Sequence, residues 1–219
     1  MLPAEGGGME INMDKSLVPF WEETYQKDNV MTFSVEPNRT IIEFEPLLKK
    51  QASILEVGCG EGQNVLYLAK QGYCNIDAFD ISESGISKLR RLCEMNRLNV
   101  NAFVQDLTTF TFDKKYDLIM SFATLCFVQK SEWKHFIKKA KDNTNVGGIH
   151  IMHIFTDVVP ASADIAPFAI GLAQDGEIQE LYNEWEILKF ESYTFEDEHP
   201  NVPKHMHSVN KIVAQKVFD

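Results

Sequence analysis

The sequence predicts an α/β fold in which helices cover both faces of a largely parallel sheet. Three observations support this. Strand-like and helix-like patterns alternate through most of the chain. One apolar run is followed directly by three alternating glycines, Gly58, Gly60 and Gly62. This pattern is typical of a buried strand that leads through a ligand-binding loop into a helix. The last two strand-like runs have no helix between them, so we expect them to pair antiparallel.

The predicted elements follow in chain order. Helical patterns come first, at residues 15–26 and 39–50. The predicted strands are residues 53–57, 75–80, 101–104, 116–121, 148–153, 186–195 and 208–216, and helices at 63–70, 83–97 and 131–143 fit between them. Ser82 and Ser131 are predicted N-caps, and Gly72 and the Gly147-Gly148 pair are predicted helix stops. The polar, proline-containing residues 196–207 are expected to form a loop.

Composition predicts one domain at residues 15–219, after a flexible tail at residues 1–14. The chain has 219 residues, 44% of them hydrophobic, and no Pro/Gly/Ser-rich linker divides it. A formal net charge of -11 opposes attraction to phosphate backbones or anionic lipid, and no apolar run reaches the roughly 18 residues of a membrane span. We therefore expect neither nucleic acid nor membrane as a partner. The sequence does not indicate an oligomeric state.

The four cysteines indicate a reducing, cytoplasmic setting. They show no C-x-x-C spacing, and no secretory signal precedes them. The sequence therefore suggests neither a disulfide framework nor a metal site. The carboxylates of residues 191–198 show no repeated ligand spacing and are interpreted as a solvated strand edge.

The glycine run and Asp80 predict a nucleotide-like cofactor. The spacing is G-x-G-x-G rather than the G-x-G-x-x-G of dinucleotide-binding proteins, which disfavours a pyrophosphate ligand. Asp80 ends a second apolar run about 20 residues later, where a carboxylate can accept hydrogen bonds from both ribose hydroxyls. A nicotinamide oxidoreductase is disfavoured by the same glycine spacing.

Residues 56–62, Asp80 and Gln105-Asp106-Leu107 resemble the S-adenosylmethionine-dependent methyltransferases of the seven-stranded Rossmann-like class. Residues 60–69, 116–121 and 182–188 resemble the TehB-like tellurite-resistance methyltransferases within it. The opening Trp21-Glu22-Glu23-Thr24-Tyr25 is also similar to thiopurine methyltransferase-like relatives. The resemblance implies a sheet of order 3-2-1-4-5-7-6 with its last strand antiparallel. It also implies S-adenosylmethionine as cofactor and a small-molecule substrate, with tellurite or a related chalcogen species as the family's candidate.

The resemblance also implies a cofactor site. Gly58, Gly60 and Gly62 would approach the amino-acid part of the cofactor, and Asp80 would hold its ribose. Asp106 would accept a hydrogen bond from the adenine amino group, and Ile81 and Leu107 would enclose the ring. The other predicted cofactor residues are Glu56, Asn64 and Ser121. The chain departs from the family at two places. Relatives commonly carry an arginine at the position of Gln63. Near the final hairpin, TehB-like relatives have a histidine followed by arginines, whereas His199 of this chain is followed by Pro200.

The need for a catalytic base depends on the nucleophile that accepts the methyl group. A soft anion needs no general base, whereas a protonated oxygen or nitrogen nucleophile needs one, and histidine is suited to this role near neutral pH. His199 is the predicted catalytic residue, because its loop could fold over the carboxyl ends of the strands. The substrate candidates are Trp21, Tyr25, His153, His205 and His207, and residues 155–176 are a predicted lid.

Other interpretations remain open. The loop histidines could be ordinary surface residues, His205-x-His207 could bind adventitious metal, and the N-terminal aromatics could simply be core. The acceptor could be a small thiol, amine or hydroxyl metabolite. The chain could also be a noncatalytic S-adenosylmethionine-binding protein.

Overall fold

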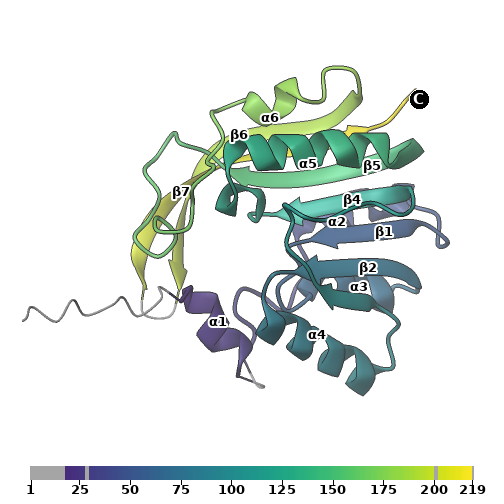
Figure 1. The fold of residues 1–219 in the computed structure, drawn as a ribbon, viewed down its shortest axis with the longest axis horizontal. Coiled ribbons are helices and arrows are strands. Elements are labelled where there is room, and N and C mark those ends of the chain that lie inside the picture. The colour runs from purple at the N-terminus through teal and green to yellow at the C-terminus, as the bar shows by residue number, and fades with distance from the viewer. Residues whose placement is uncertain (1–17, 28–29, 200–201, 219) are drawn as a thin grey trace, which may run out of the picture.

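The structure is a computed structural model that describes residues 18–27, 30–199 and 202–218. Seven strands form one sheet of order β3-β2-β1-β4-β5-β7-β6, which confirms the predicted topology (Figure 1). The strands are β1 (Ser53–Val57), β2 (Asn75–Asp80), β3 (Asn101–Val104), β4 (Tyr116–Phe122), β5 (Thr144–Phe155), β6 (Glu186–His199) and β7 (Val202–Gln215).

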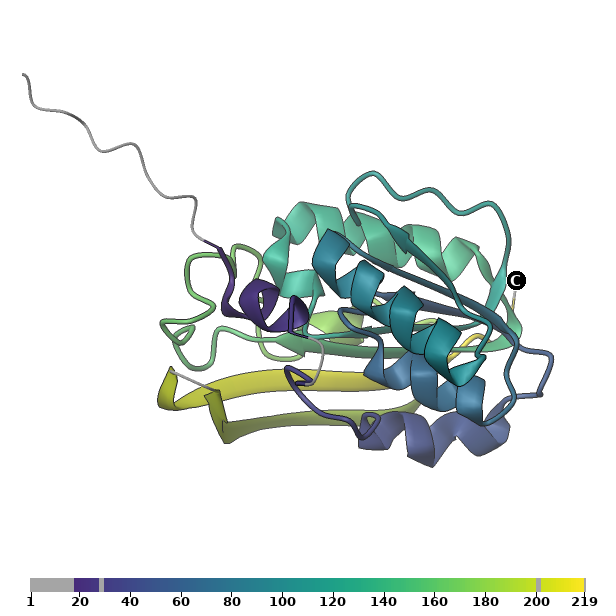
Figure 2. The same ribbon diagram turned by 90° about the horizontal axis from the view of Figure 1, so that it is seen from below.

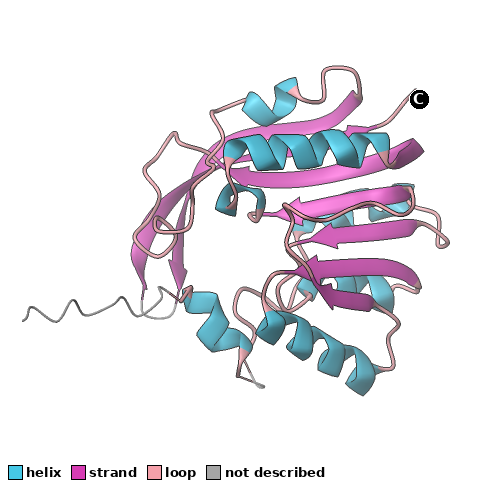
Figure 3. Ribbon diagram, viewed as in Figure 1, coloured by secondary structure: helices cyan, strands magenta, loops and turns pink. Residues whose placement is uncertain are grey.

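Helices cover both faces of the sheet (Figure 3). The helices are α1 (Phe20–Tyr25), α2 (Arg39–Phe44), α3 (Gln63–Lys70), α4 (Glu83–Asn96), α5 (Lys130–Asp142) and α6 (Glu177–Glu180), with 3-10 turns at Glu45–Leu47 and Leu125–Phe127. One core packs α2, α3 and α4 against one face of the sheet, and a second core packs α5 and α6 against the other. Successive residues of a strand point to opposite faces of the sheet and so belong to different cores. Ile54 of β1 lies in the first core, and Leu55 lies in the second.

The direction of the strands determines which loops lie at the carboxyl edge of the sheet. Neighbouring strands are parallel from β3 to β5, whereas β7 runs antiparallel to both β5 and β6. This confirms the antiparallel C-terminal pair. The pairing of β5 with β7 ends at Phe155 and Val209, while β6 and β7 stay paired out to His199 and Val202. The hairpin therefore projects past the carboxyl edge of the parallel strands.

The prediction of a loop at residues 196–207 was wrong. Most of this segment lies in β6 and β7, with Asp197 opposite His205 and Phe195 opposite His207. The segment is polar because the hairpin has one solvated face, which an antiparallel pair tolerates. As a result, His205 and His207 are strand residues that share one face, and not residues of a mobile loop.

Several predicted helix boundaries also need correction. The helix predicted at residues 39–50 changes to a 3-10 turn at Glu45, because Pro46 cannot donate the backbone hydrogen bond that would continue it. Ser82 is an N-cap as predicted and accepts from the Gly85 N–H, but Ser131 lies inside α5 after an N-cap at Gln129. Gly147 and Gly148 lie within β5 and do not stop α5.

The N-terminal helix and the segment after β5 also differ from their predicted form. α1 begins at Phe20, after Pro19, and residues 15–17 of the predicted helix and the predicted tail at 1–14 lie outside the described residues. The short helix α6 was not predicted. α1, the segment of residues 156–176 and the projecting hairpin all lie at the same end of the molecule (Figure 2).

The segment of residues 156–176 is fixed to the rest of the fold at its C-terminal part. The Gly171 N–H donates to the Cys126 carbonyl at 2.9 Å, and the Trp133 indole N–H donates to the Gly171 carbonyl at 2.8 Å. A Cβ at Gly171 would lie 2.0 Å from the Val128 carbonyl oxygen, so only glycine allows this approach. Among the described residues, the helices are too short or too polar to span a bilayer.

Candidate cofactor and substrate site

A cavity of about 890 Å³ lies at the carboxyl edge of the parallel strands. This is where open α/β sheets bind ligands. It is lined by nine of the ten predicted cofactor residues, namely Glu56, Gly58, Gly60, Gly62, Asn64, Asp80, Ile81, Asp106 and Leu107. The tenth, Ser121, is fully buried in β4 and is absent from the described lining. Four of the five predicted substrate residues, Trp21, Tyr25, His153 and His207, also line the cavity.

The glycine loop between β1 and α3 needs glycine for both conformation and space. Gly58, Gly60 and Gly62 have φ angles of +68°, +52° and +87°, in the left-handed region. A Cβ at Gly58 would lie 2.1 Å from the Thr124 hydroxyl oxygen, and one at Gly60 would lie 2.4 Å from the Tyr25 hydroxyl oxygen. The loop is therefore packed between the chain turn after β4 and the helix α1.

Asp80 at the end of β2 is oriented by backbone donors. The Gly60 N–H donates to Oδ2 at 2.7 Å, and the Ser82 N–H donates to Oδ1 at 2.8 Å. Burial raises the pKa of the Asp80 carboxyl, although these two bonds oppose the shift. The backbone N–H of Ile81 also acts on this carboxyl, so the carboxylate is held in a fixed orientation at the cavity wall.

Glu56 belongs to a buried polar chain beneath the glycine loop. The Asn64 side-chain amide donates to Glu56 Oε1 at 2.6 Å, and Asn64 Oδ1 accepts from the Asn38 N–H at 2.9 Å. Burial raises the pKa of the Glu56 carboxyl to about 8. The hydrogen bond from Asn64 lowers the pKa and the nearby Asp80 raises it, but burial is the largest cause. Glu56 is therefore a carboxyl that holds a proton at neutral pH in the unliganded protein.

The raised pKa of Glu56 predicts that the unliganded protein loses stability as pH rises. The carboxyl has an ordinary pKa of 4.5 in the unfolded chain and about 8 in the native state, so the native state binds the extra proton between these values. Glu56 should therefore contribute a fall of up to about 1.4 kcal/mol per pH unit in the free energy of unfolding over this window.

Urea unfolding from about pH 5 to about pH 8 measures this slope. Glu56→Gln, which cannot ionise, should remove that contribution, whereas Glu94→Gln on the exposed side of α4 should leave the slope unchanged. Equal slopes in Glu56→Gln and the wild type would contradict the assignment.

Acidic groups dominate the electrostatics around the glycine loop. Glu22 of α1 raises the pKa of Asp80, and Asp80 in turn raises the pKa of Glu56. Glu22 also accepts a hydrogen bond from the Ser84 hydroxyl, which holds it against the start of α4. A cationic ligand placed here would be attracted by Glu22 and Asp80 and would favour ionisation of Glu56. The end of the cavity lined by the predicted cofactor residues therefore favours positive charge.

Glu61, the next acidic residue of the loop, is neutralised by Lys88. The Lys88 Nζ lies 2.6 Å from Glu61 Oε2, and the two side chains are 1% and 4% exposed. Glu61 also accepts from the Thr32 N–H, and Lys88 donates to the Val30 carbonyl. The pair therefore joins the glycine loop, α4 and the chain after α1.

The opposite end of the cavity is largely aromatic. Trp21 of α1 contacts Phe127 and Phe168, with ring centroids 5.2 Å and 5.8 Å apart. Phe155 stacks on His207, with centroids 4.6 Å apart. The Lys211 Nζ lies 4.8 Å from the centre of the Tyr193 ring and adds a positive charge to this wall. This end can exclude water around a small ligand.

The predicted histidines lie in different environments in the structure. Burial lowers the pKa of His153 to about 3, with Lys211 and Lys189 as smaller causes, so this ring is neutral and a weak proton acceptor. Its Nε2 lies 3.2 Å from the Thr40 hydroxyl oxygen. His207 lines the cavity. Its Nε2 lies 3.0 Å from Nε2 of His205, a residue that is not among the described lining residues. His199 is the last residue of β6, and its side chain lies outside the described residues.

The structure adds two features of the site. Ala123 follows β4 with a φ of +55°, a rare conformation for a residue with a Cβ, and lines the cavity beside Thr124. Asp164 of the segment 156–176 lies near His205, with Oδ2 3.8 Å from His205 Nε2. No sequence signal placed Asp164 there, because the contact joins segments far apart in the chain.

A family model and two curated relatives identify the family of the chain. The family described as tellurite resistance protein TehB matches residues 22–202. A curated relative from Haemophilus influenzae (strain ATCC 51907 / DSM 11121 / KW20 / Rd), named probable S-adenosyl-L-methionine-dependent methyltransferase TehB, is 32% identical over 139 residues, which are 63% of this chain and 47% of the relative. The chain thus spans about half the length of the curated relatives it matches first.

Solved structures show the same fold. The crystal structure of TehB from Haemophilus influenzae has a TM-score of 0.73 at 24% identity, covering 90% of this chain and 67% of the other. A structure from Methanosarcina mazei, described among SAM-dependent methyltransferases, has a TM-score of 0.65 at 20% identity and covers 84% of this chain and 100% of its own. At these sequence identities, the two structural matches show a shared backbone fold.

Proposed function

The chain belongs to the TehB family of tellurite resistance proteins, and from this premise we propose that it is an S-adenosylmethionine-dependent methyltransferase acting on a small molecule. The observation that carries the proposal is Asp80, held by the Gly60 and Ser82 N–H groups at the wall of the cavity. A carboxylate fixed beside a glycine loop at the carboxyl end of the second strand is placed to accept the two hydroxyls of a ribose.

The residues around Asp80 fit the rest of the cofactor. Asp106 is oriented by hydrogen bonds from the Thr108 N–H and hydroxyl and is proposed to accept from the adenine amino group. Ile81, which is 71% exposed, and Leu107 line the cavity and would enclose the ring. The acidic groups Glu22 and Asp80 would favour the cationic sulfonium, and a bound cation would in turn favour ionisation of Glu56.

The bound cofactor supplies an activated methyl group, so the protein must mainly orient the acceptor and exclude water. The aromatic end of the cavity, with Trp21, Phe155 and Phe168, provides the water-excluding wall. His153 is neutral there and bonded to Thr40, so it is poorly suited to act as a base. This combination supports a soft anionic acceptor that needs no deprotonation.

We therefore propose tellurite or a related chalcogen species as the acceptor, with Lys211 and His207 as the cationic and hydrogen-bonding groups of its site. A small thiol would suit the same site as its thiolate. A hydroxyl or amine acceptor would need a base, and His199 is the predicted candidate for that role. All four cysteines are free, which fits the proposed cytoplasmic location.

Calorimetric titration with S-adenosylmethionine, S-adenosylhomocysteine and NADH tests the cofactor. The two adenosyl ligands should bind one per chain, and NADH should bind far more weakly because the glycine spacing does not suit a pyrophosphate. Preferential binding of NADH would overturn the proposal.

Methyl transfer is then measured with isotopically labelled cofactor and a panel of tellurite, selenite, small thiols and small amines. Turnover with chalcogen oxyanions that persists at low pH, where histidine is protonated, supports the soft-anion acceptor. Turnover confined to amines, and lost as pH falls through the histidine range, would favour the base-dependent alternative. Cofactor binding with no transfer to any acceptor in the panel would favour a noncatalytic binding protein.

A further inference from the structure

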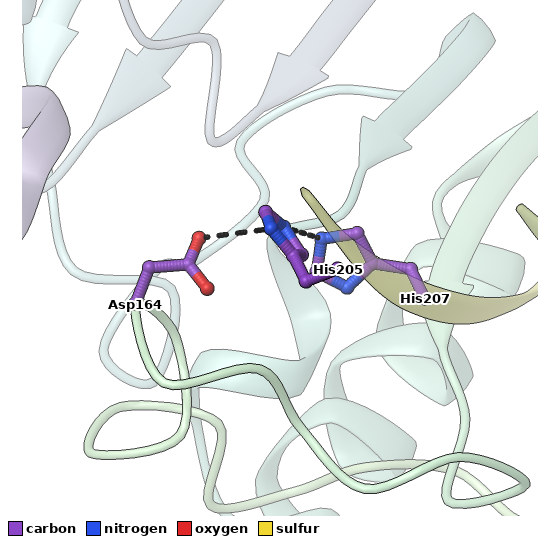
Figure 4. A group of neighbouring side chains, drawn as sticks. All are labelled: Asp164, His205 and His207. Carbon is purple, nitrogen blue, oxygen red and sulfur yellow. Dashed lines mark hydrogen bonds and ion pairs between the residues drawn. The ribbon is translucent and has the colours of Figure 1, made fainter. Parts of the chain in front are cut away.

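Three side chains with metal-binding atoms meet between the segment of residues 156–176 and β7 (Figure 4). Asp164, His205 and His207 each offer one ligand atom, and these atoms all lie within 4.8 Å of one another. The Nε2 atoms of the two histidines are 3.0 Å apart, and Asp164 Oδ2 is 3.8 Å from His205 Nε2. In Figure 4 the carboxylate points toward the two rings from across the gap between the loop and the strand.

A backbone contact fixes the tautomer of His205. Its Nδ1 lies 2.8 Å from the Pro203 carbonyl oxygen. A carbonyl oxygen can only accept, so Nδ1 carries the proton and Nε2 of the neutral ring presents a lone pair. Histidines that bind metals usually donate their other ring N–H in this way, which orients the ring and raises its basicity. The contact therefore prepares His205 Nε2 as a ligand.

The other two side chains are also held in place. His207 is two residues along the same strand and shares the face of His205. It is 3% exposed and stacks on Phe155. The Asp164 side chain is 2% exposed, and the next residue, Ile165, is buried and bonded through its N–H to the Ser162 carbonyl. The three groups are therefore positioned before any ion binds.

From this geometry we propose that Asp164, His205 and His207 bind one divalent transition-metal ion, with zinc as the best fit. Zinc binds histidine nitrogen and carboxylate oxygen at about 2.0–2.2 Å, so ligand atoms around a tetrahedral ion lie about 3.3 Å apart. The separations of 3.0 Å and 3.8 Å lie on either side of this value. Two imidazoles and one carboxylate suit zinc better than calcium or magnesium, which prefer oxygen ligands.

Three protein ligands leave the fourth position of a tetrahedral ion open, as in catalytic rather than structural zinc sites. His207 lines the aromatic end of the cavity together with Phe155 and Lys211. One of the three ligands thus lines the cavity, so a bound ion would lie near it and could take an anionic group such as a thiolate or oxyanion as its fourth ligand. Ion binding itself does not depend on the proposed function, because it requires neither cofactor nor acceptor.

Zinc binding is tested on tag-free protein that has been dialysed against EDTA, by competition with a chromophoric chelator and without any methyl donor. The background variant Cys74→Ser removes the exposed cysteine, which could bind zinc independently. Asp164→Asn and His205→Ala remove one ligand each. His135→Ala on α5 is the matched control, because its side chain is exposed and lies outside the cluster.

The expected result is one zinc ion per chain, bound more than about 100-fold more weakly by Asp164→Asn and His205→Ala, since loss of a ligand costs more than loss of an outer-shell partner. His135→Ala should bind as the background does. A crystal soaked in zinc should show an anomalous peak between the three side chains, a readout that needs no variant. Equal affinity in all variants, or a peak only elsewhere, would overturn the proposal. Circular dichroism of the metal-free variants shows whether each is folded.

Discussion

Replacing Lys88 by methionine should lower the free energy of unfolding by about 3–5 kcal/mol, the usual cost of removing one partner of a buried ion pair. The Lys88 Nζ lies 2.6 Å from Glu61 Oε2, and both side chains are almost completely buried. The substitution keeps the apolar stem of Lys88 but leaves the Glu61 charge without its counter-ion. It also removes the hydrogen bond to the Val30 carbonyl. Urea unfolding at pH about 7 measures the loss.

Two further variants separate charge from packing. The double variant Glu61→Gln/Lys88→Met should recover much of the stability, because it leaves no buried charge unpaired. Lys138→Met on the exposed face of α5 should change the free energy of unfolding by less than about 0.5 kcal/mol. A loss below about 1 kcal/mol in Lys88→Met would mean that water screens the pair in solution, contrary to its burial in the structure.

Replacing Asp80 by alanine should weaken S-adenosylmethionine binding by about 1.5–3 kcal/mol, the range for hydrogen bonds to a charged group. The carboxylate is fixed by the Gly60 and Ser82 N–H groups, so its loss removes the proposed ribose acceptor and also loosens the loop that would surround the ligand. Calorimetric titration of the variant beside the wild type measures the change.

Asp113→Ala is the control for Asp80→Ala, because Asp113 is exposed and lies outside the cavity lining. Its affinity should equal that of the wild type. Unchanged affinity in Asp80→Ala would show that the ribose assignment is incorrect. Urea unfolding of the ligand-free variant distinguishes a lost ligand contact from a loop that no longer folds, since only the latter lowers stability markedly.

The fold around the proposed cofactor half of the site could be predicted from the sequence because its signals are local. Strand, glycine loop and helix follow one another from Ser53 to Lys70, and the bounds of β1, α3 and β2 match the predicted ranges. Glycines at fixed spacing and a carboxylate at a strand end report directly on backbone geometry. No folding of distant segments is needed to recognise them.

The acceptor half could not be predicted in the same way, because it depends on long-range contacts. The polar residues of 196–207 indicate a loop when read alone, and only pairing with the partner strand turns them into β6 and β7. Asp164 meets His205 only through the path of the segment 156–176. Burial, which makes His153 neutral, is likewise a property of the whole fold and not of the neighbouring sequence.

The two ends of the cavity come largely from separate parts of the chain. Apart from Glu22, Tyr25 and Asn38, the proposed cofactor end comes from residues 56–107, while much of the aromatic end comes from Trp21, Phe33, residues 155–170 and described residues of β6 and β7. Substitutions in residues 155–170 and in the hairpin of β6 and β7 can reshape the proposed acceptor wall while leaving the glycine loop unchanged, whereas α1 packs against that loop through Tyr25. Under the proposed function, acceptor preference can therefore diverge between descendants of one ancestral gene while the methyl donor stays the same.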